Sequence, residues 1–246
     1  MKLSCSYQFK PKKPTCNTSY VQSVFGIGFE VGENIVARDV EIDYPPAPRA
    51  GPGKIVLFAG PSGSGKSSLL RAAALQVQDA VELDESQRDE RALIDTLGDD
   101  VKEAAHLLSL CGLGEAFLML RSSHELSDGQ RYRYGIARCL ANKARTVVAD
   151  EWCAKLDRVT AKVISRSARK IANRRGVGFL LATTHEDLID DLQPDIVVRC
   201  RGSGIVEVES RVPFAARSVF FHGSKSPKVP LRTGRTSLGG IIAGTA

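Results

Sequence analysis

The stretch at 60–67 has residue types and a spacing that can bind nucleotide phosphates. It reads GPSGSGKS and matches the pattern G-x-x-x-x-G-K-[ST]. Glycines let several backbone N–H groups converge on phosphate oxygens, and the lysine adds a positive charge that reaches the β- and γ-phosphates. The hydroxyl of the last serine is a ligand that Mg²⁺ accepts. The sequence therefore predicts binding of ATP or a similar triphosphate with Mg²⁺, through Gly60, Pro61, Ser62, Gly63, Ser64, Gly65, Lys66, Ser67 and Ser68.

Three later stretches carry side chains suited to phosphoryl chemistry. One apolar run ends in Asp150 and Glu151, and another ends beside His185. A carboxylate can hold Mg²⁺ through water, and a second one can orient an attacking water molecule. Ser127 and Gly129 stand where a helix is expected to begin, and the N–H groups at that end of a helix attract anions. These residues point to hydrolysis or transfer of a phosphoryl group.

The elements that must position these side chains alternate along the chain. The apolar pattern predicts short strands between stretches of helical periodicity. Such alternation is typical of an α/β domain with a largely parallel sheet. The expected strands lie at 21–25, 29–31, 35–43, 55–59, 81–83, 146–149, 178–183, 195–199 and 205–208, and the expected helices at 67–77, 88–120, 127–141 and 160–173.

Four stretches, in their order along the chain, resemble the ABC-type ATPases (ATP-binding cassette proteins). ELSDGQR at 125–131 resembles the signature loop, and TVVADE at 146–151 resembles the Walker B strand. LD at 156–157 resembles the D-loop, and TTHED at 183–187 resembles the loop of the switch histidine. The resemblance implies an α/β P-loop NTPase fold with a mainly parallel core sheet, a small antiparallel β part and a shortened helical lobe.

The resemblance also implies roles for individual residues in ATP hydrolysis. Glu151 would orient the attacking water, Lys66 would hold the β- and γ-phosphates, and His185 would contact the γ-phosphate. Two protomers would enclose two ATP molecules head to tail in a homodimer. The implied ligands of Mg²⁺ are Ser67, Asp150 and Gln87, and the implied contacts to the ATP of the other subunit are Ser127, Gly129 and Gln130.

Two of these assignments have alternatives in the sequence. The aromatic side chain expected to stack on adenine is Phe29, with Phe25 as the next candidate and Val31 at the usual position. A phenylalanine of the core is an equally good interpretation of Phe29. Gln87 is the candidate for the glutamine that senses Mg²⁺, and a plain surface glutamine is the alternative.

Both ends of the chain are basic, although the whole chain of 246 residues carries a net charge of only +6. Residues 1–20 hold four lysines and no acid, and residues 211–246 hold six lysines and arginines and no acid. Such segments are most often disordered and solvated, and they can also bind nucleic acid or anionic lipid. We expect a basic tail at 1–20, an ABC-type ATPase domain at 21–211 and a second basic, disordered tail at 212–246.

Other features of the sequence indicate where in the cell the protein is located. No apolar run approaches the roughly 20 residues of a membrane span, and the N-terminus lacks the apolar region of a signal peptide. The six cysteines show no C-x-x-C spacing, which argues against a disulfide framework or a zinc site. We therefore expect a cytoplasmic protein without membrane insertion.

The leading hypothesis is a soluble ABC-type ATPase that dimerises on ATP and transmits its movement to an unknown protein partner. The stretches at 125–133, 182–188 and 191–195 resemble a soluble group that is sometimes fused to a predicted acetyltransferase domain. Asp128 departs from the family pattern, because glycine is commonest there.

The alternatives are the nucleotide-binding subunit of an ABC transporter, a small-molecule kinase and an inactive nucleotide-gated module. The short segment between Lys66 and Ser127 argues against the transporter subunit. The loops around Ser127 and His185 argue against the kinase, which would have no use for them. The intact Lys66, Asp150, Glu151 and His185 argue against the inactive module.

Overall fold

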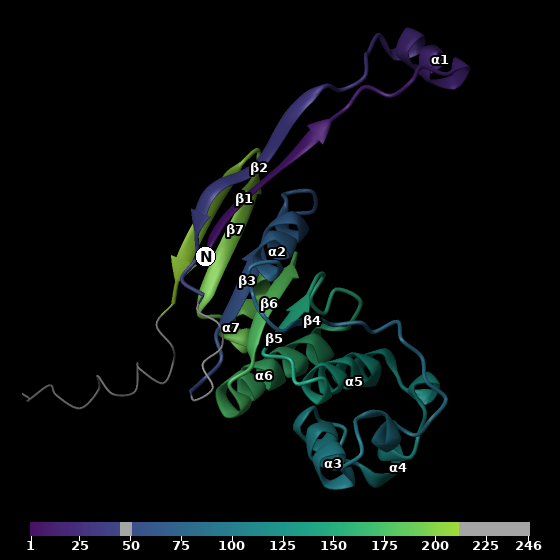
Figure 1. The fold of residues 1–246 in the computed structure, drawn as a ribbon, viewed down its shortest axis with the longest axis vertical. Coiled ribbons are helices and arrows are strands. Elements are labelled where there is room, and N and C mark those ends of the chain that lie inside the picture. The colour runs from purple at the N-terminus through teal and green to yellow at the C-terminus, as the bar shows by residue number, and fades with distance from the viewer. Residues whose placement is uncertain (45–50, 212–246) are drawn as a thin grey trace, which may run out of the picture. The chain divides into compact units, whose positions relative to one another are not determined.

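The computed structural model describes residues 1–44 and 51–211, and a six-stranded sheet lies at its centre (Figure 1). The strand order is β4-β5-β6-β3-β7-β8, and all neighbours are parallel except the antiparallel pair β7 and β8. The prediction of an α/β fold with a mainly parallel sheet is confirmed. The strands are β3 (Ile55–Ala59), β4 (Ala80–Glu82), β5 (Thr146–Ala149), β6 (Gly178–Thr183), β7 (Ile196–Gly202) and β8 (Ile205–Ser210).

Both faces of the sheet are covered, as the continuous apolar character of its strands requires. Strand β3 illustrates this, because all five of its residues are buried. Ile55 and Leu57 belong to a core shared with helices α5 and α6 and the helical lobe, whereas Val56 and Phe58 belong to a second core shared with α2, β1 and β2. This division follows from the period of two along a strand.

Helices α2, α5 and α6 begin and end close to where the sequence predicts them. The expected helical segment at 88–120 is divided into η1, α3 and α4, which form the helical lobe. Gly98 and Gly112, both at positive φ, separate these short pieces. The helices are α2 (Lys66–Ala74), η1 (Leu93–Thr96), α3 (Val101–Leu110), α4 (Ala116–Met119), η2 (Ser123–Glu125), α5 (Asp128–Ala141), α6 (Arg158–Arg175), η3 (Glu186–Leu188) and α7 (Ile189–Leu192).

The N-terminal region differs from the prediction. Residues 1–20 are not simply a tail, because β1 (Lys2–Phe9) pairs with β2 (Gly32–Glu41) in a two-stranded antiparallel sheet. Leu3 is fully buried and ties β1 to the second core. The small antiparallel β part is thus present, and it includes a strand from the basic segment.

Residues 21–25, expected to be a strand, lie in helix α1 (Cys16–Phe25). Their valines favour a strand, but local signals at both ends of the segment favour a helix. Thr15 caps the first turn in a reciprocal capping box with Thr18, and Gly26 ends the helix in the left-handed conformation. The expected strand at 29–31 is also wrong, since these residues precede β2 without forming a strand.

The basic tail expected at 212–246 lies outside the described part of the chain. Among the described helices, none combines the length and the apolar character needed to cross a membrane.

Candidate functional site

The phosphate-binding stretch, the two acids and the histidine predicted from the sequence gather at one edge of the central sheet. The phosphate-binding stretch follows β3, Asp150 and Glu151 follow β5, and Thr184 and His185 follow β6. These three strands are parallel neighbours, so their carboxyl ends meet at the same edge. In open α/β sheets, ligands bind outside the carboxyl ends of the strands.

The loop between β3 and α2 is shaped for close approach to a ligand. Gly65 has a φ of +91°, and a Cβ there would lie 2.1 Å from Cγ1 of Val36. Only glycine fits this position, which lets α2 begin directly at the loop. Lys66 is buried and donates a hydrogen bond from Nζ to the carbonyl oxygen of Pro61 at 2.6 Å. The ammonium group therefore lies against the loop whose N–H groups would donate hydrogen bonds to phosphate oxygens.

Ser67 and Asp150 lie next to each other across two elements. The Ser67 hydroxyl donates a hydrogen bond to Oδ1 of Asp150 at 3.0 Å, and the same carboxylate oxygen accepts from the Glu151 backbone N–H at 3.0 Å. A hydroxyl and a carboxylate oxygen are the hard oxygen ligands that Mg²⁺ prefers. The pair therefore fits a magnesium ion. Glu151 itself has a φ of +51°, an uncommon conformation for a residue other than glycine, and such conformations cluster at functional sites.

A cavity of about 590 Å³ joins these groups. Such a volume is within the usual range of sites for small molecules and nucleotides. The cavity lies between the phosphate-binding loop, the carboxyl ends of β5 and β6, and strands β1 and β2. Gly60 and Pro61 begin the loop without lining the cavity. Predicted site residues that line it are Ser62, Gly63, Ser64, Gly65, Lys66, Ser67, Ser68, Asp150, Glu151 and His185.

The structure does not bring Phe29 to this cavity; the aromatic side chain that lines it is Tyr7. Tyr7 lies on β1, is half-exposed and forms a hydrogen bond through its hydroxyl group with the Ser68 hydroxyl. Phe29 lies in the segment between α1 and β2 instead. The alternation of Leu3, Cys5 and Tyr7 along a strand was the signal in the sequence, but the basic composition of residues 1–20 favoured a tail.

Ser127, Gly129 and Gln130 do not line the cavity either. They begin helix α5, where Ser127 and Gln130 form a reciprocal capping box with distances of 3.4 and 3.0 Å. Gly129 allows α5 to pack against α6, because a Cβ there would lie 2.7 Å from Cγ2 of Thr160. Within one chain, these residues form a separate surface at a helix N-terminus.

Asp128, the departure from the family pattern, lies at the same helix start. Its side chain is exposed and pairs with Arg131 at 2.8 Å. The carboxylate is therefore solvent-exposed and partly neutralised by the guanidinium group.

Gln87 also lies away from the cavity, where its amide oxygen accepts a hydrogen bond from Arg138 on α5. The residue of this loop that approaches the two acids after β5 is Glu85. It lines a smaller cavity of about 80 Å³ together with Asp150 and Glu151. The loop that follows β4 thus reaches the site through a carboxylate rather than through the predicted amide.

Lys155 balances the charge of these carboxylates. It lines the smaller cavity and pairs with Glu85 at 2.7 Å. The hydrogen bond and the charge of Glu85, with a smaller contribution from Glu151, raise the pKa of Lys155. The ammonium group therefore stays positive beside the acids.

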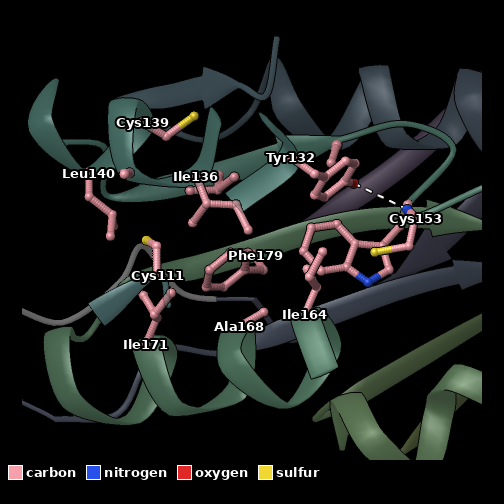
Figure 2. Close-up of a cluster of buried hydrophobic side chains, with 14 of the residues drawn as sticks. Cys111, Tyr132, Ile136, Cys139, Leu140, Cys153, Ile164, Ala168, Ile171 and Phe179 are labelled. Atoms are coloured by element: carbon pink, nitrogen blue, oxygen red, sulfur yellow. Dashed lines mark hydrogen bonds between the residues drawn. The ribbon is translucent and has the colours of Figure 1, made fainter. Parts of the chain in front are cut away.

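A buried aromatic cluster lies behind Glu151. Trp152 is fully buried, and its ring meets those of Tyr132 and Phe179 edge to face at centroid distances of 5.4 and 6.4 Å. The Tyr132 hydroxyl accepts a hydrogen bond from the Cys153 backbone N–H at 3.2 Å (Figure 2). Burial raises the pKa of the Cys153 thiol to about 12, so this cysteine is a neutral core residue. The packing of Trp152 and the hydrogen bond to Cys153 therefore fix the backbone that directly follows Glu151.

Fold and site together define an ATP-binding cassette ATPase: a P-loop strand and helix, two acids after a parallel strand, and a histidine after the next. The family model described as ABC transporter matches residues 76–154. The chain is 31% identical over 194 residues to the lipoprotein-releasing system ATP-binding protein LolD of Novosphingobium aromaticivorans, covering 63% of this chain and 85% of LolD. It is 29% identical over 203 residues to LolD 2 of Caulobacter vibrioides, covering 65% of this chain and 84% of that protein.

The chain belongs to the family of ABC transporter ATP-binding proteins and is an ATPase of that class. Solved structures share the fold. The dimeric ATP-binding cassette MJ0796 in a post-hydrolysis state with ADP and Pi has a TM-score of 0.56 at 18% identity, covering 76% of this chain and 96% of that one. The ADP conformation of the cassette MJ1267 has a TM-score of 0.60 at 16% identity, covering 86% and 92%. The predicted fold, including its small antiparallel sheet, is confirmed.

Proposed function

We propose that this protein hydrolyses ATP with Mg²⁺ in a homodimer that encloses two ATP molecules and drives a conformational change in a partner. The observation that supports this most is the convergence of Lys66, the Ser67–Asp150 pair, Glu151 and His185 on one cavity. These groups come from three loops, and phosphoryl transfer depends on such positioning more than on covalent chemistry. The proposed catalytic unit spans residues 1–211, with the basic segment 212–246 outside it.

Each side chain has a proposed task in the reaction. Lys66 holds the β- and γ-phosphates, and Glu151 orients the attacking water and accepts its proton. His185 contacts the γ-phosphate and responds to its loss. Ser67 and Asp150 hold Mg²⁺, which when bound neutralises the charge that develops on the phosphate oxygens.

The surface formed by Ser127, Gly129 and Gln130 completes the site of a second protomer in this proposal. Within one chain these residues lie apart from the cavity, so they are available to another copy. The N–H groups at the start of α5 would meet the γ-phosphate held by that copy. The solvent exposure of Asp128 and its pairing with Arg131 reduce the repulsion between its carboxylate and the triphosphate.

The Ser127→Arg variant tests the dimer. We expect it to abolish ATP-dependent dimerisation and to lower turnover roughly 100-fold, since the larger charged side chain displaces the helix N-terminus from the phosphate. Sizing chromatography with light scattering in Mg-ATP, together with phosphate release, measures both effects. Ser210→Arg, at the end of edge strand β8, is the matched control and should behave as wild type. A monomeric enzyme whose turnover is unchanged by Ser127→Arg would refute the proposal.

Tyr7, the aromatic side chain that lines the cavity, is the proposed stacking partner of adenine, and the Tyr7→Ala variant tests this assignment. Stacking of a base on an aromatic ring is worth about 1–3 kcal/mol by alanine substitution, so ATP affinity should fall by at least about fivefold. Tyr7→Phe keeps the ring and should retain most of the affinity, and Phe29→Ala should have no effect. Titration with a fluorescent ATP analogue measures the three affinities. A loss in Phe29→Ala but not in Tyr7→Ala would support the contact expected from the sequence instead.

The kind of partner that the ATPase acts on distinguishes two versions of this function. A soluble cytoplasmic ATPase, as in the acetyltransferase-linked group that the sequence resembles, would act on a soluble partner or on nucleic acid bound by the basic segments. The description of the matching family model as ABC transporter, together with relatives named as ATP-binding proteins of a lipoprotein-releasing system, favours an ATP-binding subunit of a transporter instead. Affinity purification of the Glu151→Gln variant with Mg-ATP, from detergent extract and from cytosol, distinguishes them. Stoichiometric recovery of an integral membrane protein would establish the transporter subunit.

A further inference from the structure

Helix α1 connects β1 to β2 and extends beyond the ends of these two strands (Figure 1). None of its residues is buried. The helix is nevertheless defined at both ends, by the Thr15–Thr18 capping box and by Gly26 at a φ of +64°. A short, capped helix is therefore exposed to solvent at the end of strands β1 and β2.

One side of α1 is apolar and exposed. Four large apolar side chains follow the spacing that places residues on one helix face, and its two aromatic members are 71% and 69% exposed. Exposed apolar side chains continue after the helix, up to the start of β2. A contiguous exposed apolar surface of this kind marks an interaction site. The residues on the helix are Tyr20, Val21, Val24 and Phe25, and those after it are Ile27 and Val31.

The segment that leads into this helix is positively charged. Lys10, Lys12 and Lys13 are all exposed, and none of them forms an ion pair with the described residues. Glu30 is the only acidic residue between 10 and 31. The other residues of α1 include no charged side chain: Thr18, Ser19, Gln22 and Ser23 are polar, and Asn17 lies one turn before Val21 on the same side.

We propose that the segment 10–31, here called the α1 arm, docks on the surface of an anionic lipid bilayer. Its aromatic and aliphatic side chains would enter the boundary between headgroups and acyl chains, and its three lysines would meet the anionic headgroups. Membrane anchoring by two weak signals, one apolar and one polybasic, is an established physical combination. The charge complementarity of the lysines selects an acidic surface over a neutral one.

Other occupants fit the arm less well. Nucleic acid would use the lysines and the rings of Tyr20 and Phe25, but it has no use for Val21, Val24 or Ile27, which cannot stack on bases. The apolar face spans less than two turns of helix, whereas a stable protein interface involves roughly 20–30 residues on each side. A bilayer requires no such area, because it moulds itself around individual inserted side chains.

The arm is continuous with the nucleotide site. Tyr7 on β1 and Asn34 and Ile35 on β2 line the large cavity, and the arm joins these two strands. Docking on a membrane would therefore hold the protein through the strands that border the nucleotide. The proposal does not depend on whether ATP hydrolysis occurs as proposed above.

The test is sedimentation of the full chain with vesicles of phosphatidylcholine alone and of phosphatidylcholine with about 30% phosphatidylglycerol. We expect binding to the anionic vesicles to be at least about tenfold stronger, and to weaken when salt rises from about 50 to about 300 mM. The double variant Val24→Asp/Phe25→Asp should lower this binding at least about tenfold, because it removes apolar contacts and adds negative charge. The triple variant Lys10→Ser/Lys12→Ser/Lys13→Ser should separately lower it by a similar factor.

The matched control is Phe117→Asp, which changes an exposed apolar residue of α4 outside the arm. It should bind anionic vesicles as wild type does. ATP turnover and the far-UV circular dichroism spectrum should be unchanged in all of these variants, which shows that they are folded.

Four results would overturn the proposal. The first is equal binding to neutral vesicles, and the second is binding that the arm variants leave intact but that is lost when the five basic residues at 217–235 are changed to serine. The third is binding of a single-stranded oligonucleotide, but not of vesicles, through the arm. The fourth is a concentration-dependent dimer without ATP that the double variant abolishes while vesicle binding is absent.

Discussion

The Glu151→Gln variant is expected to lose ATP turnover by about 10²–10⁴-fold, the usual contribution of a general base. The amide keeps the size of the side chain, so it still fills the space beside Asp150, but it cannot take a proton from water. Removal of the negative charge also reduces repulsion of the triphosphate. We therefore expect the variant to bind ATP and to accumulate as a dimer that wild type forms only transiently.

Phosphate release and light scattering in Mg-ATP measure these two effects together. The matched control is Glu82→Gln, because Glu82 is an exposed carboxylate at the end of the neighbouring strand β4. It should leave both turnover and dimerisation unchanged. Retention of more than about a tenth of the wild-type turnover in Glu151→Gln would show that another group activates the water. Glu85, which lines the smaller cavity beside Glu151, would then be the next residue to change.

The Trp152→Ala variant is expected to lower the free energy of unfolding by about 3–5 kcal/mol. Trp152 is fully buried between Tyr132 and Phe179, and its indole N–H donates a hydrogen bond to the Ser165 hydroxyl at 3.0 Å. The substitution removes the ring from the interface between α5, α6 and β6, and it leaves a cavity that these rigid elements cannot close. It also leaves the buried Ser165 hydroxyl without this partner, which adds to the cost.

Urea denaturation followed by circular dichroism measures this loss, through the midpoint at unchanged slope. Trp152→Phe keeps most of the volume and should cost clearly less than the alanine variant. Turnover of Trp152→Ala should also fall, because the residue next to Glu151 loses its ring packing against Phe179 of β6, the strand that leads to His185, and keeps only the backbone hydrogen bond to the Ala182 carbonyl oxygen at 2.7 Å. A cost below about 1 kcal/mol would show that the cluster is loosely packed.

The parts of the site that could be predicted from the sequence are those whose signal is local. The phosphate-binding loop needs a glycine at position 65 and a lysine and a serine directly after it, so its pattern is contiguous in the chain. Asp150, Glu151 and His185 each follow a short apolar run, and parallel buried strands place such residues at one edge of a sheet. The apolar runs and their alternation with helical segments also predicted the α/β fold, because burial on both faces of a sheet requires such strands.

The N-terminal segment shows where composition was misleading. Its four lysines indicated a tail, yet Leu3 enters the second core and Tyr7 reaches the large cavity. A strand of this kind is stabilised by its pairing with β2, about 30 residues further along the chain, and by packing against the second core, more than by its intrinsic propensity. No local pattern of residues 1–9 could show that partner.

The contacts of Gln87 and Glu85 depend in the same way on distant parts of the chain. Both residues lie in the loop after β4. Gln87 is held by Arg138 on α5, and Glu85 is held by Lys155, which follows β5. The sequence alone therefore determined the phosphate-binding loop, the two acids, the histidine and the class of fold. Only the tertiary structure showed that Tyr7 on β1 borders the nucleotide cavity, that Glu85 approaches the two acids, and that α1 is exposed at the end of its two strands. Long-range packing and strand pairing govern all three features.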